Sequence, residues 1–371
     1  MNQYHMNLKE IKYDCKYFKG HIPCEPNKKH NLICDSCEEY EQIKTRVLII
    51  KLGAIGDVIR STPLITKLRQ LHPSCHITWL TLTPQILPPD EIDEILNLNY
   101  ISLFKLSHLQ FNIAINLDKD PEICMLMSDI DAAEKYGFTW KNGHIASFND
   151  AAEKKLLTGL FDSVSKKNTK SYLEEIFEIC GFKYEGEEYL LNKNIRLTEK
   201  WQRSLKKISG SNKFIIGLNT GCGDRWPTRL WPDDYWIQLI QHLTQKGYFC
   251  LLLGGAAEDE KNKMISLKTD AYYPGNFSLE EFISLSSVCN LIVTQVSMMM
   301  HIATGLKKKL VLMNNIFNKH EFELFGRGII IEPESGCDCY YGTTCKRELN
   351  CMNDINSETV ANAVFNLIPL E

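Results

Sequence analysis

The sequence lacks both a long hydrophobic run and a surplus of either charge. Its 371 residues carry 42 Lys and Arg against 46 Asp and Glu, a formal net charge of −4, and the lysines are spread along the chain. This composition gives no electrostatic reason to expect a nucleic-acid partner. No apolar segment approaches the length that spans a bilayer, and the N-terminal stretch MNQYHMNLKEIKYDC has no apolar core of signal-peptide length. We therefore expect a soluble cytoplasmic protein.

Two common glycine motifs for nucleotide binding are also missing from the first strand-to-loop edge. The hydrophobic run VLIIKL leads into GAIGD, where Gly53 and Gly56 lack the further glycines of a dinucleotide fingerprint, and no Gly-Lys-Ser/Thr follows. We therefore do not expect this first loop to bind a nucleotide.

What is present is a repeated alternation of strand-like and helix-like segments. The runs VLIIKL, CHITWLTL and FNIAINL occur in the first half, and FIIGLN, YFCLLLGG, LIVTQ and KLVLMN occur in the second, with helical candidates between them. Alternation of this kind predicts parallel sheets and an α/β fold. The length fits two domains, which we place at residues 46–210 and 211–335. The final helix, near 357–367, could return to the first domain.

The segments outside these two domains are rich in cysteine. Residues 1–45 and 336–371 each contain four of the fourteen cysteines: Cys15, Cys24, Cys34 and Cys37 in the first, and Cys337, Cys339, Cys345 and Cys351 in the second. In a reducing compartment such clusters favour metal over disulfides, and each can make a tetrahedral four-thiolate site for zinc or iron. We favour a metal that pins segments unable to fold alone over a redox role. The remaining six cysteines lie in apolar surroundings typical of core residues.

Asp57 is the candidate catalytic residue of the first half. It follows Gly56 just after a predicted buried strand, where a carboxylate could take a proton from an attacking hydroxyl. The alternative is that Asp57 caps the helix that follows, which is a common role for Asp after a strand.

The loop TGCGDRWPTRLWP, after the strand FIIGLN, is the candidate anion site of the second half. Backbone N–H groups of residues 220–223 and the guanidinium of Arg229 could hold a phosphate, because arginine forks match phosphate oxygens. The alternative is that Arg225 and Arg229 stack on Trp226 and Trp231 at the surface.

Two further segments could face the same ligand. A helix that begins near Ser297 would direct its positive end and free N–H groups at an anion. His301 lies one turn into that helix, although a histidine on an apolar helix is more often a core residue. Glu258, after the turn Gly254-Gly255, could bind ribose hydroxyls, or it could be a solvated acid at a helix start.

Four segments together carry a family resemblance. IIKLGAIGDVIRSTP, GLNTGCGDRWPTRLWP, LLLGGAAEDE and VTQVSMMMHIATGL, in this order, resemble the ADP-heptose:lipopolysaccharide heptosyltransferases, glycosyltransferase family 9, over roughly residues 46–368. The resemblance implies a GT-B fold, in which two Rossmann-like domains with parallel sheets face one another, with the acceptor in the first and an ADP-sugar in the second. It implies that Asp57 is the general base and that Arg229 touches the donor diphosphate. It also implies donor-binding roles for Thr220, Gly221, Glu258, Ser297, Met298 and His301.

Two features depart from the family pattern. Val296-Ser297 stands where many members have Asp-Thr before the helix that carries the histidine. The cysteine clusters are absent from the lipopolysaccharide-core enzymes, whereas the autotransporter heptosyltransferases are similar in carrying an iron-binding cysteine finger and glycosylate protein.

The sequence thus predicts a metal-stapled bacterial glycosyltransferase that moves a heptose, or a related sugar, from an ADP-activated donor to a lipopolysaccharide or other cell-surface glycan, with inversion. Arginine and a helix end can stabilise the departing diphosphate, so we expect no metal in the chemistry itself. The alternatives are a protein O-heptosyltransferase and a catalytically silent nucleotide-sugar-binding scaffold. The acceptor is a glycan, lipid-linked or protein partner, which allows peripheral association with the inner face of the inner membrane. A homo-oligomer is also allowed.

Overall fold

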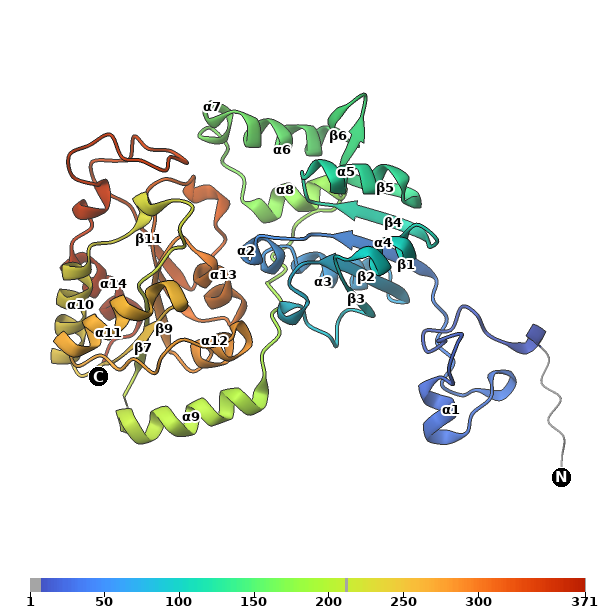
Figure 1. Ribbon diagram of the computed structural model, residues 1–371, viewed down its shortest axis with the longest axis horizontal. Coiled ribbons are helices and arrows are strands. Elements are labelled where there is room, and N and C mark those ends of the chain that lie inside the picture. Colours follow the sequence, from blue (N-terminus) through green and yellow to red (C-terminus); the bar gives the residue numbers. More distant parts are fainter. Residues whose placement is uncertain (1–7, 211–212, 371) are drawn as a thin grey trace. The chain divides into compact units, whose positions relative to one another are not determined.

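The computed structural model describes residues 8–210 and 213–370 (Figure 1). Residues 1–7 of the predicted cysteine-rich segment, residues 211–212 beside the predicted domain boundary, and residue 371 lie outside the described residues. The chain divides into two compact units. The first comprises the chain up to residue 51 together with 64–82 and 89–149, and the second comprises 52–63, 83–88 and the chain from residue 150 onward.

The first unit is built on a six-stranded sheet of order β3-β2-β1-β4-β5-β6. All neighbouring strands are parallel except β5 and β6, which form an antiparallel hairpin. The four residues 47–50 of β1 are fully buried, as expected for a strand in a parallel sheet with both faces covered. The strands are β1 (Thr45–Ile50), β2 (Cys75–Thr81), β3 (Glu94–Asn97), β4 (Gln110–Asn116), β5 (Asp131–Lys141) and β6 (His144–Ser147), and the helices beside them are α3 (Pro63–Leu71), α4 (Tyr100–Leu106) and α5 (Pro121–Asp129).

The N-terminal cysteine-rich segment has little regular structure. It contains η1 (Leu8–Glu10), α1 (Glu25–His30) and η2 (Cys34–Ser36), and an isolated β-bridge joins Cys15 to Gln42. The Asp14 carboxylate accepts hydrogen bonds from Tyr40 Oη and Gln42 Nε2, both at 2.9 Å, and these bonds lower the pKa of Asp14. Side-chain contacts therefore close this segment into a loop.

The second unit is built on a five-stranded, fully parallel sheet of order β11-β10-β9-β7-β8. Its central strands β7 and β9 are buried along their whole length, and the sequence order of the strands reverses between them. The strands are β7 (Ile215–Asn219), β8 (Phe249–Leu253), β9 (Leu291–Gln295), β10 (Lys309–Met313) and β11 (Gly328–Ile331), and the main helices are α10 (Asp233–Gln245), α11 (Asp259–Lys268), α12 (Leu279–Ser286), α13 (Met298–Gly305) and α14 (Ser357–Leu367).

The last helix packs within the second unit, whereas we had allowed for its return to the first domain. Figure 1 shows α14 beside α10 within the second unit, where Ser357 Oγ lies 2.9 Å from Gln238 Oε1. Val360, Ala361 and Val364 of α14 belong to the buried core of this unit. The apolar face of α14 therefore completes the second core.

Residues 150–210 also pack with the second unit, although we had placed them in the first domain. This region holds α6 (Asp150–Leu160), α7 (Asp162–Ser165), α8 (Tyr172–Ile179) and α9 (Ile195–Ser209). Thr198 Oγ1 of α9 lies 3.2 Å from Ser287 Oγ, and the rings of Trp201 and Phe277 meet edge to face at 5.1 Å. A short piece of the first half, 52–63, likewise belongs to the second unit and carries α2 (Ile55–Ile59).

Within the described ranges 8–210 and 213–370, no helix combines the length and apolar character needed to cross a membrane.

Candidate functional site

A pocket of about 290 Å³ lies at the carboxyl ends of β7 and β9 in the second unit. The loop after β7, the turn after β8 and the start of α13 line it. Strand order reverses between β7 and β9, and in open parallel sheets ligands bind in the crevice at such a switch point. The position of this pocket follows directly from the topology of the sheet.

The loop after β7 is held by side chains of the two central strands. Asn219, the last residue of β7, donates through Nδ2 to the Gly221 carbonyl at 2.7 Å and to Thr294 Oγ1 of β9 at 3.0 Å. Thr294 Oγ1 lies 3.2 Å from Ser297 Oγ at the start of α13. This buried polar network joins the loop after β7 to the loop after β9 and fixes two walls of the pocket.

Gly221 and Glu258 approach each other closely in the pocket wall. A Cβ added to Gly221 would overlap the Glu258 carboxylate, so a larger residue would have to displace the Glu258 side chain. Glu258 Oε2 in turn accepts the Gly255 N–H at 2.9 Å, which closes the turn after β8. The Glu258 carboxylate is thus both a cap for this turn and an acceptor group at the pocket.

The start of α13 forms the third wall. Ser297 is the N-cap, and its Oγ accepts the N–H of Met299 at 3.3 Å. Met298 and Met299 line the pocket, so the positive end of the helix is directed at it. Val296, where the family pattern has an acid, is buried.

Arg229 lies behind this pocket rather than in its lining. Its Nε donates to the Trp226 carbonyl at 3.2 Å, and its two Nη groups donate to the carbonyls of Val296 and Cys222. Burial of the guanidinium lowers the pKa of Arg229. Arg229 therefore braces the loop after β7 against the loop after β9.

The other arginine of this loop behaves as the alternative interpretation expected. The Arg225 guanidinium stacks over the Trp226 ring at 4.3 Å, and Arg225 is exposed. Thr220, by contrast, is fully buried, and its hydroxyl donates to Asn262 Oδ1 at 2.6 Å beneath the pocket. Of the predicted donor-binding residues, Gly221, Glu258, Ser297 and Met298 line the pocket, whereas Thr220, Arg229 and His301 do not.

His301, one turn into α13, packs against α2. A Cβ on Gly56 of α2 would overlap the His301 ring, so the two helices touch at this point. His301 is buried and its Nδ1 has no hydrogen-bond partner among the described residues. Burial, together with the positive charge of Arg60, lowers the pKa of His301 to about 3. The imidazole is therefore neutral over the physiological pH range.

Asp57 lies in the first turn of α2, but it is not the N-cap residue of that helix, which is Ala54. Its side chain is 34% exposed, and its Oδ1 lies 2.8 Å from Arg60 Nη2. The carboxylate is thus partly open to solvent and held by a cation three residues further on. The same helix α13 begins at the pocket and contacts α2 one turn later, which links the pocket to Asp57.

The C-terminal cysteines lie in pairs. The Cys337 thiol faces Cys351, and the Cys339 thiol faces both Cys345 and Cys337. Backbone N–H groups point at these sulfurs, with Cys339 N–H donating to Cys337 Sγ at 3.4 Å. Backbone N–H groups of Arg347 and Cys351 lower the pKa of Cys345. Four thiols with N–H donors are the ligand chemistry that zinc or iron requires.

Nevertheless, no set of three or more His, Cys, Asp or Glu in the described part of the chain is gathered closely enough to hold a metal ion as it stands. At the N-terminal cluster, Cys24 precedes α1, Cys34 begins η2 and Cys37 follows it. All eight cysteines are free thiols in the structure. The metal sites therefore stay predictions.

Sequence reasoning missed a buried ion pair in the first unit. Lys51 Nζ contacts Asp118 Oδ1, and the two side chains are only 7% and 5% exposed. They follow β1 and β4, the strands between which the order of the first sheet reverses. Part of the signal was available, because Lys51 lies near the end of the predicted run VLIIKL and Asp118 directly follows the run FNIAINL. This pair marks the carboxyl-end crevice of the first sheet.

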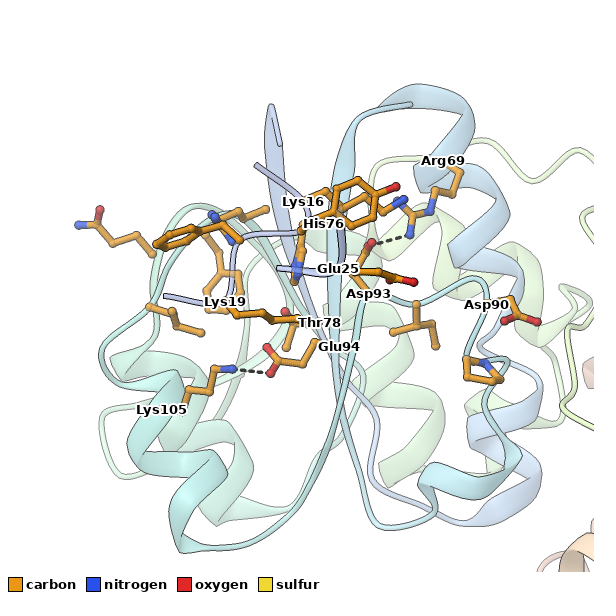
Figure 2. A pocket seen from close by; sticks show the side chains of 18 of the residues that line it. Lys16, Lys19, Glu25, Arg69, His76, Thr78, Asp90, Asp93, Glu94 and Lys105 are labelled. Atoms are coloured by element: carbon orange, nitrogen blue, oxygen red, sulfur yellow. Dashed lines mark hydrogen bonds and ion pairs between the residues drawn. The ribbon is translucent and has the colours of Figure 1, made fainter. Parts of the chain in front are cut away.

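A larger pocket, of about 820 Å³, lies elsewhere in the first unit. It is bordered by the starts of β1, β2, β3 and β4 and by the N-terminal segment. Figure 2 shows ion pairs within its lining, Arg69 with Asp93 at 2.7 Å and Lys105 with Glu94. Because ligands of parallel sheets bind at the opposite, carboxyl edge, we assign the function to the smaller pocket.

The two parallel-dominated sheets, with a pocket at the carboxyl-end switch point of the second, define an α/β protein of the Rossmann-like class. A family model, glycosyltransferase family 9 (heptosyltransferase), matches residues 104–323, which is more than half of the chain. The chain belongs to glycosyltransferase family 9, and the family expected from the sequence motifs is confirmed.

Relatives of known function match over a shorter stretch. Lipopolysaccharide heptosyltransferase 2 of Escherichia coli K12 is 30% identical over 108 residues, which are 27% of this chain and 31% of that enzyme. The counterpart from Salmonella typhimurium is 29% identical over 108 residues, again 27% of this chain and 31% of the enzyme. The chain thus aligns with about a third of the length of these curated relatives.

Solved structures match over most of the chain. A glycosyltransferase family 9 protein from Veillonella parvula superposes with a TM-score of 0.69 at 17% identity, covering 88% of this chain and 98% of that one. E. coli ADP-heptose lipopolysaccharide heptosyltransferase II gives 0.63 at 17% identity, covering 87% and 98%. The dodecameric iron-containing heptosyltransferase TibC, solved with ADP-D-β-D-heptose, gives 0.53 at 12% identity, covering 87% and 76%. These likenesses confirm the predicted α/β fold of the GT-B class.

Proposed function

We propose that this protein transfers a heptose, with inversion, from an ADP-activated donor to a hydroxyl group of a lipopolysaccharide or other cell-surface glycan. The observation that carries the proposal is the link between the pocket at the β7–β9 switch point and Asp57, made by a single helix. Helix α13 begins in the wall of the pocket, and one turn later His301 touches the helix that bears Asp57.

The pocket supplies the groups that a nucleoside diphosphate requires. The positive end of α13 and the N–H groups of the loop after β7 suit the phosphates, because helix ends and free N–H groups bind anions. Glu258 suits the ribose, since a carboxylate after the glycine turn of such a sheet accepts hydrogen bonds from sugar hydroxyls. Lys261 lies nearby, with its Nζ 3.3 Å from the Thr220 carbonyl, but its charge is paired with Asp233 Oδ1 at 2.6 Å.

Arg229 has a different part in this proposal from the direct phosphate contact expected from the sequence. Its guanidinium donates hydrogen bonds to the carbonyls of Trp226, Val296 and Cys222. It therefore keeps the N–H groups of the loop directed at the donor, and its charge adds to the potential of the pocket without direct contact. Preorganised dipoles and charges of this kind stabilise a departing diphosphate.

In the proposed reaction Asp57 is the general base. The acceptor hydroxyl gives its proton to the Asp57 carboxylate while its oxygen forms a bond to the anomeric carbon of the donor. The bond from that carbon to the β-phosphate oxygen breaks, and its electron pair leaves with ADP. Attack from the face opposite the diphosphate inverts the anomeric centre. We assign the acceptor to the first unit, where Lys51 and Asp118 mark the carboxyl edge of the sheet.

We also propose that the cysteine clusters hold structural zinc or iron. Cys337, Cys339, Cys345 and Cys351 would form one site, and Cys15, Cys24, Cys34 and Cys37 the other. The metal would pin loops that have few apolar residues of their own. Elemental analysis of protein purified without air should find about two ions per chain, one for each set of four thiolates. Protein free of both zinc and iron would refute the proposal.

The function is tested by calorimetric titration with ADP, ADP-heptose and UDP-glucose, followed by turnover assays. We expect ADP and ADP-heptose to bind and UDP-glucose to bind much more weakly. Asp57→Asn should bind ADP as the parent does but lose turnover by a factor of about 100 or more. Retained turnover in that variant would remove Asp57 from the role of base.

A second candidate is transfer to protein, because the cysteine clusters resemble those of the autotransporter heptosyltransferases, which glycosylate protein, and an iron-containing heptosyltransferase is among the structural neighbours. Supplying the protein with a donor and either a lipopolysaccharide core or a candidate acceptor protein separates the two. The silent-scaffold alternative rests on the buried Val296 and predicts ADP binding without turnover on any acceptor.

A further inference from the structure

Arg60, the C-cap residue of α2, makes more contacts than an ordinary surface ion pair. Its Nη2 lies 2.8 Å from Asp57 Oδ1. A pair three residues apart on an exposed helix contributes little, because water and salt screen it. Here, however, the Arg60 side chain is only 13% exposed, so the guanidinium is largely removed from water. Its contacts with other elements therefore decide where it points.

Two further elements hold the Arg60 guanidinium. Its Cζ stacks 3.5 Å from the centre of the Tyr172 ring of α8, a cation–π contact. Its Nη1 lies 3.9 Å from Glu321 Oε2 in the turn η6 (Lys319–Glu321). Arginine has a planar fork, so one stacked face and two contacts at its edge fix its orientation.

Glu321 is itself held by the cysteine-rich loop. The Tyr341 hydroxyl donates to Glu321 Oε1 at 2.9 Å. The Tyr341 ring meets Phe317 at 5.0 Å and Trp226 at 6.0 Å, both edge to face. A chain of contacts thus runs from Tyr341 through Glu321 and Arg60 to the Asp57 carboxylate.

The charged groups near Asp57 and Arg60 act in two directions. Burial disfavours the charged guanidinium, yet the pKa of Arg60 is raised because Asp57, Tyr172, Glu321 and Tyr189 outweigh that cost. Arg60 therefore stays a cation at every relevant pH. His301, from α13, is neutral and adds no positive charge. Glu321 is an anion that partly offsets Arg60, at the longer distance of 3.9 Å.

We propose that Arg60 is a positioning residue that holds the Asp57 carboxylate in place for proton transfer, and that Glu321 and Tyr341 hold Arg60. This inference rests on the proposed role of Asp57 as the base. Arg60 touches no reacting atom in this scheme and acts through Asp57. An opposite charge in contact favours the ionised form of a carboxylate, so Arg60 also keeps Asp57 ready to accept a proton.

The test compares Arg60→Met with Arg60→Lys. The Met variant removes the charge but keeps an unbranched apolar chain against Tyr172, whereas the Lys variant keeps a charge without the planar fork. In Arg60→Met we expect kcat to fall at least tenfold and the acidic limb of the kcat–pH profile to move up by about 1 pH unit, since the Asp57 pKa rises without its cation. In Arg60→Lys the acidic limb of the kcat–pH profile should lie where it does in the wild type, whereas kcat should recover only in part.

Three measurements make the outcome decisive. ADP affinity should be unchanged in both variants, because Arg60 lies outside the pocket lining, and this shows that the fold is intact. The Asp57 carboxyl should also be titrated directly by NMR of ¹³C-labelled aspartate, with Asp57→Asn to assign the signal, so that the result does not depend on an acceptor. An Asp57 pKa and pH profile that are both unchanged in Arg60→Met would overturn the inference. If Asp57→Asn instead keeps full turnover, the proposed function fails and not merely the role of Arg60.

Discussion

The His301 ring lies directly on Gly56, and a side chain added to Gly56 would have to displace the ring or one of the two helices. A Cβ at this position would overlap the ring carbon Cδ2 and approach Nε2. Gly56 immediately precedes Asp57, and His301 lies one turn from the pocket wall. This contact therefore fixes the position of the proposed base relative to the pocket.

Replacing Gly56 by Ala should separate α2 from α13. We expect Gly56→Ala to lower turnover at least tenfold and the free energy of unfolding by about 1–3 kcal/mol, because overpacking a buried contact forces the backbone to shift. Urea unfolding and a turnover assay measure the two effects. The double variant Gly56→Ala/His301→Ala should recover part of the lost stability, because the smaller side chain removes the overlap. If the stability losses of the two single variants simply add in the double variant, the proposed contact is contradicted.

Glu258 should determine whether the protein distinguishes ribose hydroxyls. The wild type should bind ADP about tenfold more tightly than 2′,3′-dideoxy-ADP, since a hydrogen bond to a carboxylate stabilises by roughly 1.5–3 kcal/mol. Glu258→Ala should bind both nucleotides equally and weakly. The matched control is Glu260→Ala, which removes a side chain that is 89% exposed in α11, the helix that Glu258 precedes. If Glu258→Ala kept the preference for ADP, the ribose would lie elsewhere.

Arg229 should matter more for the stability of the loop than Arg225. We expect Arg229→Met to lower the free energy of unfolding by about 2–4 kcal/mol, because it leaves buried carbonyls without donors. ADP affinity should fall with it as the loop after β7 loosens. The exposed Arg225 gives the control, since Arg225→Met should change stability by no more than about 0.5 kcal/mol. Equal losses of stability in the two variants would argue against the role of Arg229 in holding the two loops together.

His301 should make the protein less stable in mild acid. Its pKa is lowered to about 3, so between that value and the ordinary pKa of 6.5 the unfolded chain binds a proton that the folded chain does not. Stability from this residue is complete above pH 6.5 and is lost as the pH falls toward 3. From pH 7 to pH 5 the loss should be about 2 kcal/mol.

The comparison for this pH effect is His301→Gln, which cannot titrate in this range. Urea unfolding at pH 7 and pH 5 should show a stability loss in the wild type that exceeds the loss in the variant. The same slope in both proteins would show that other groups account for the acid sensitivity.

Much of the fold was predictable because buried parallel strands have a simple sequence pattern. The runs VLIIKL, FIIGLN and LIVTQ are almost continuously apolar, and each became a central strand. The glycine turns after the first two runs were predictable from local sequence, because Gly53 and Gly221 follow them closely. Ser297 as a helix start also followed from local chemistry, because its hydroxyl accepts a backbone N–H.

The sequence by itself therefore determined the strands, the turns at their ends and the polar residues that those turns carry, because these depend on neighbours along the chain. Only the tertiary structure decided what the charged side chains do. The sequence predicts a phosphate contact for Arg229, but in the structure two carbonyls of its own loop and the Val296 carbonyl of the loop after β9 surround its guanidinium. Arg60 reads as one end of a helical ion pair until Tyr172 and Glu321, distant in sequence, enclose it. A charged group takes its role from the dielectric and the partners around it, and those are assembled only when the chain has folded.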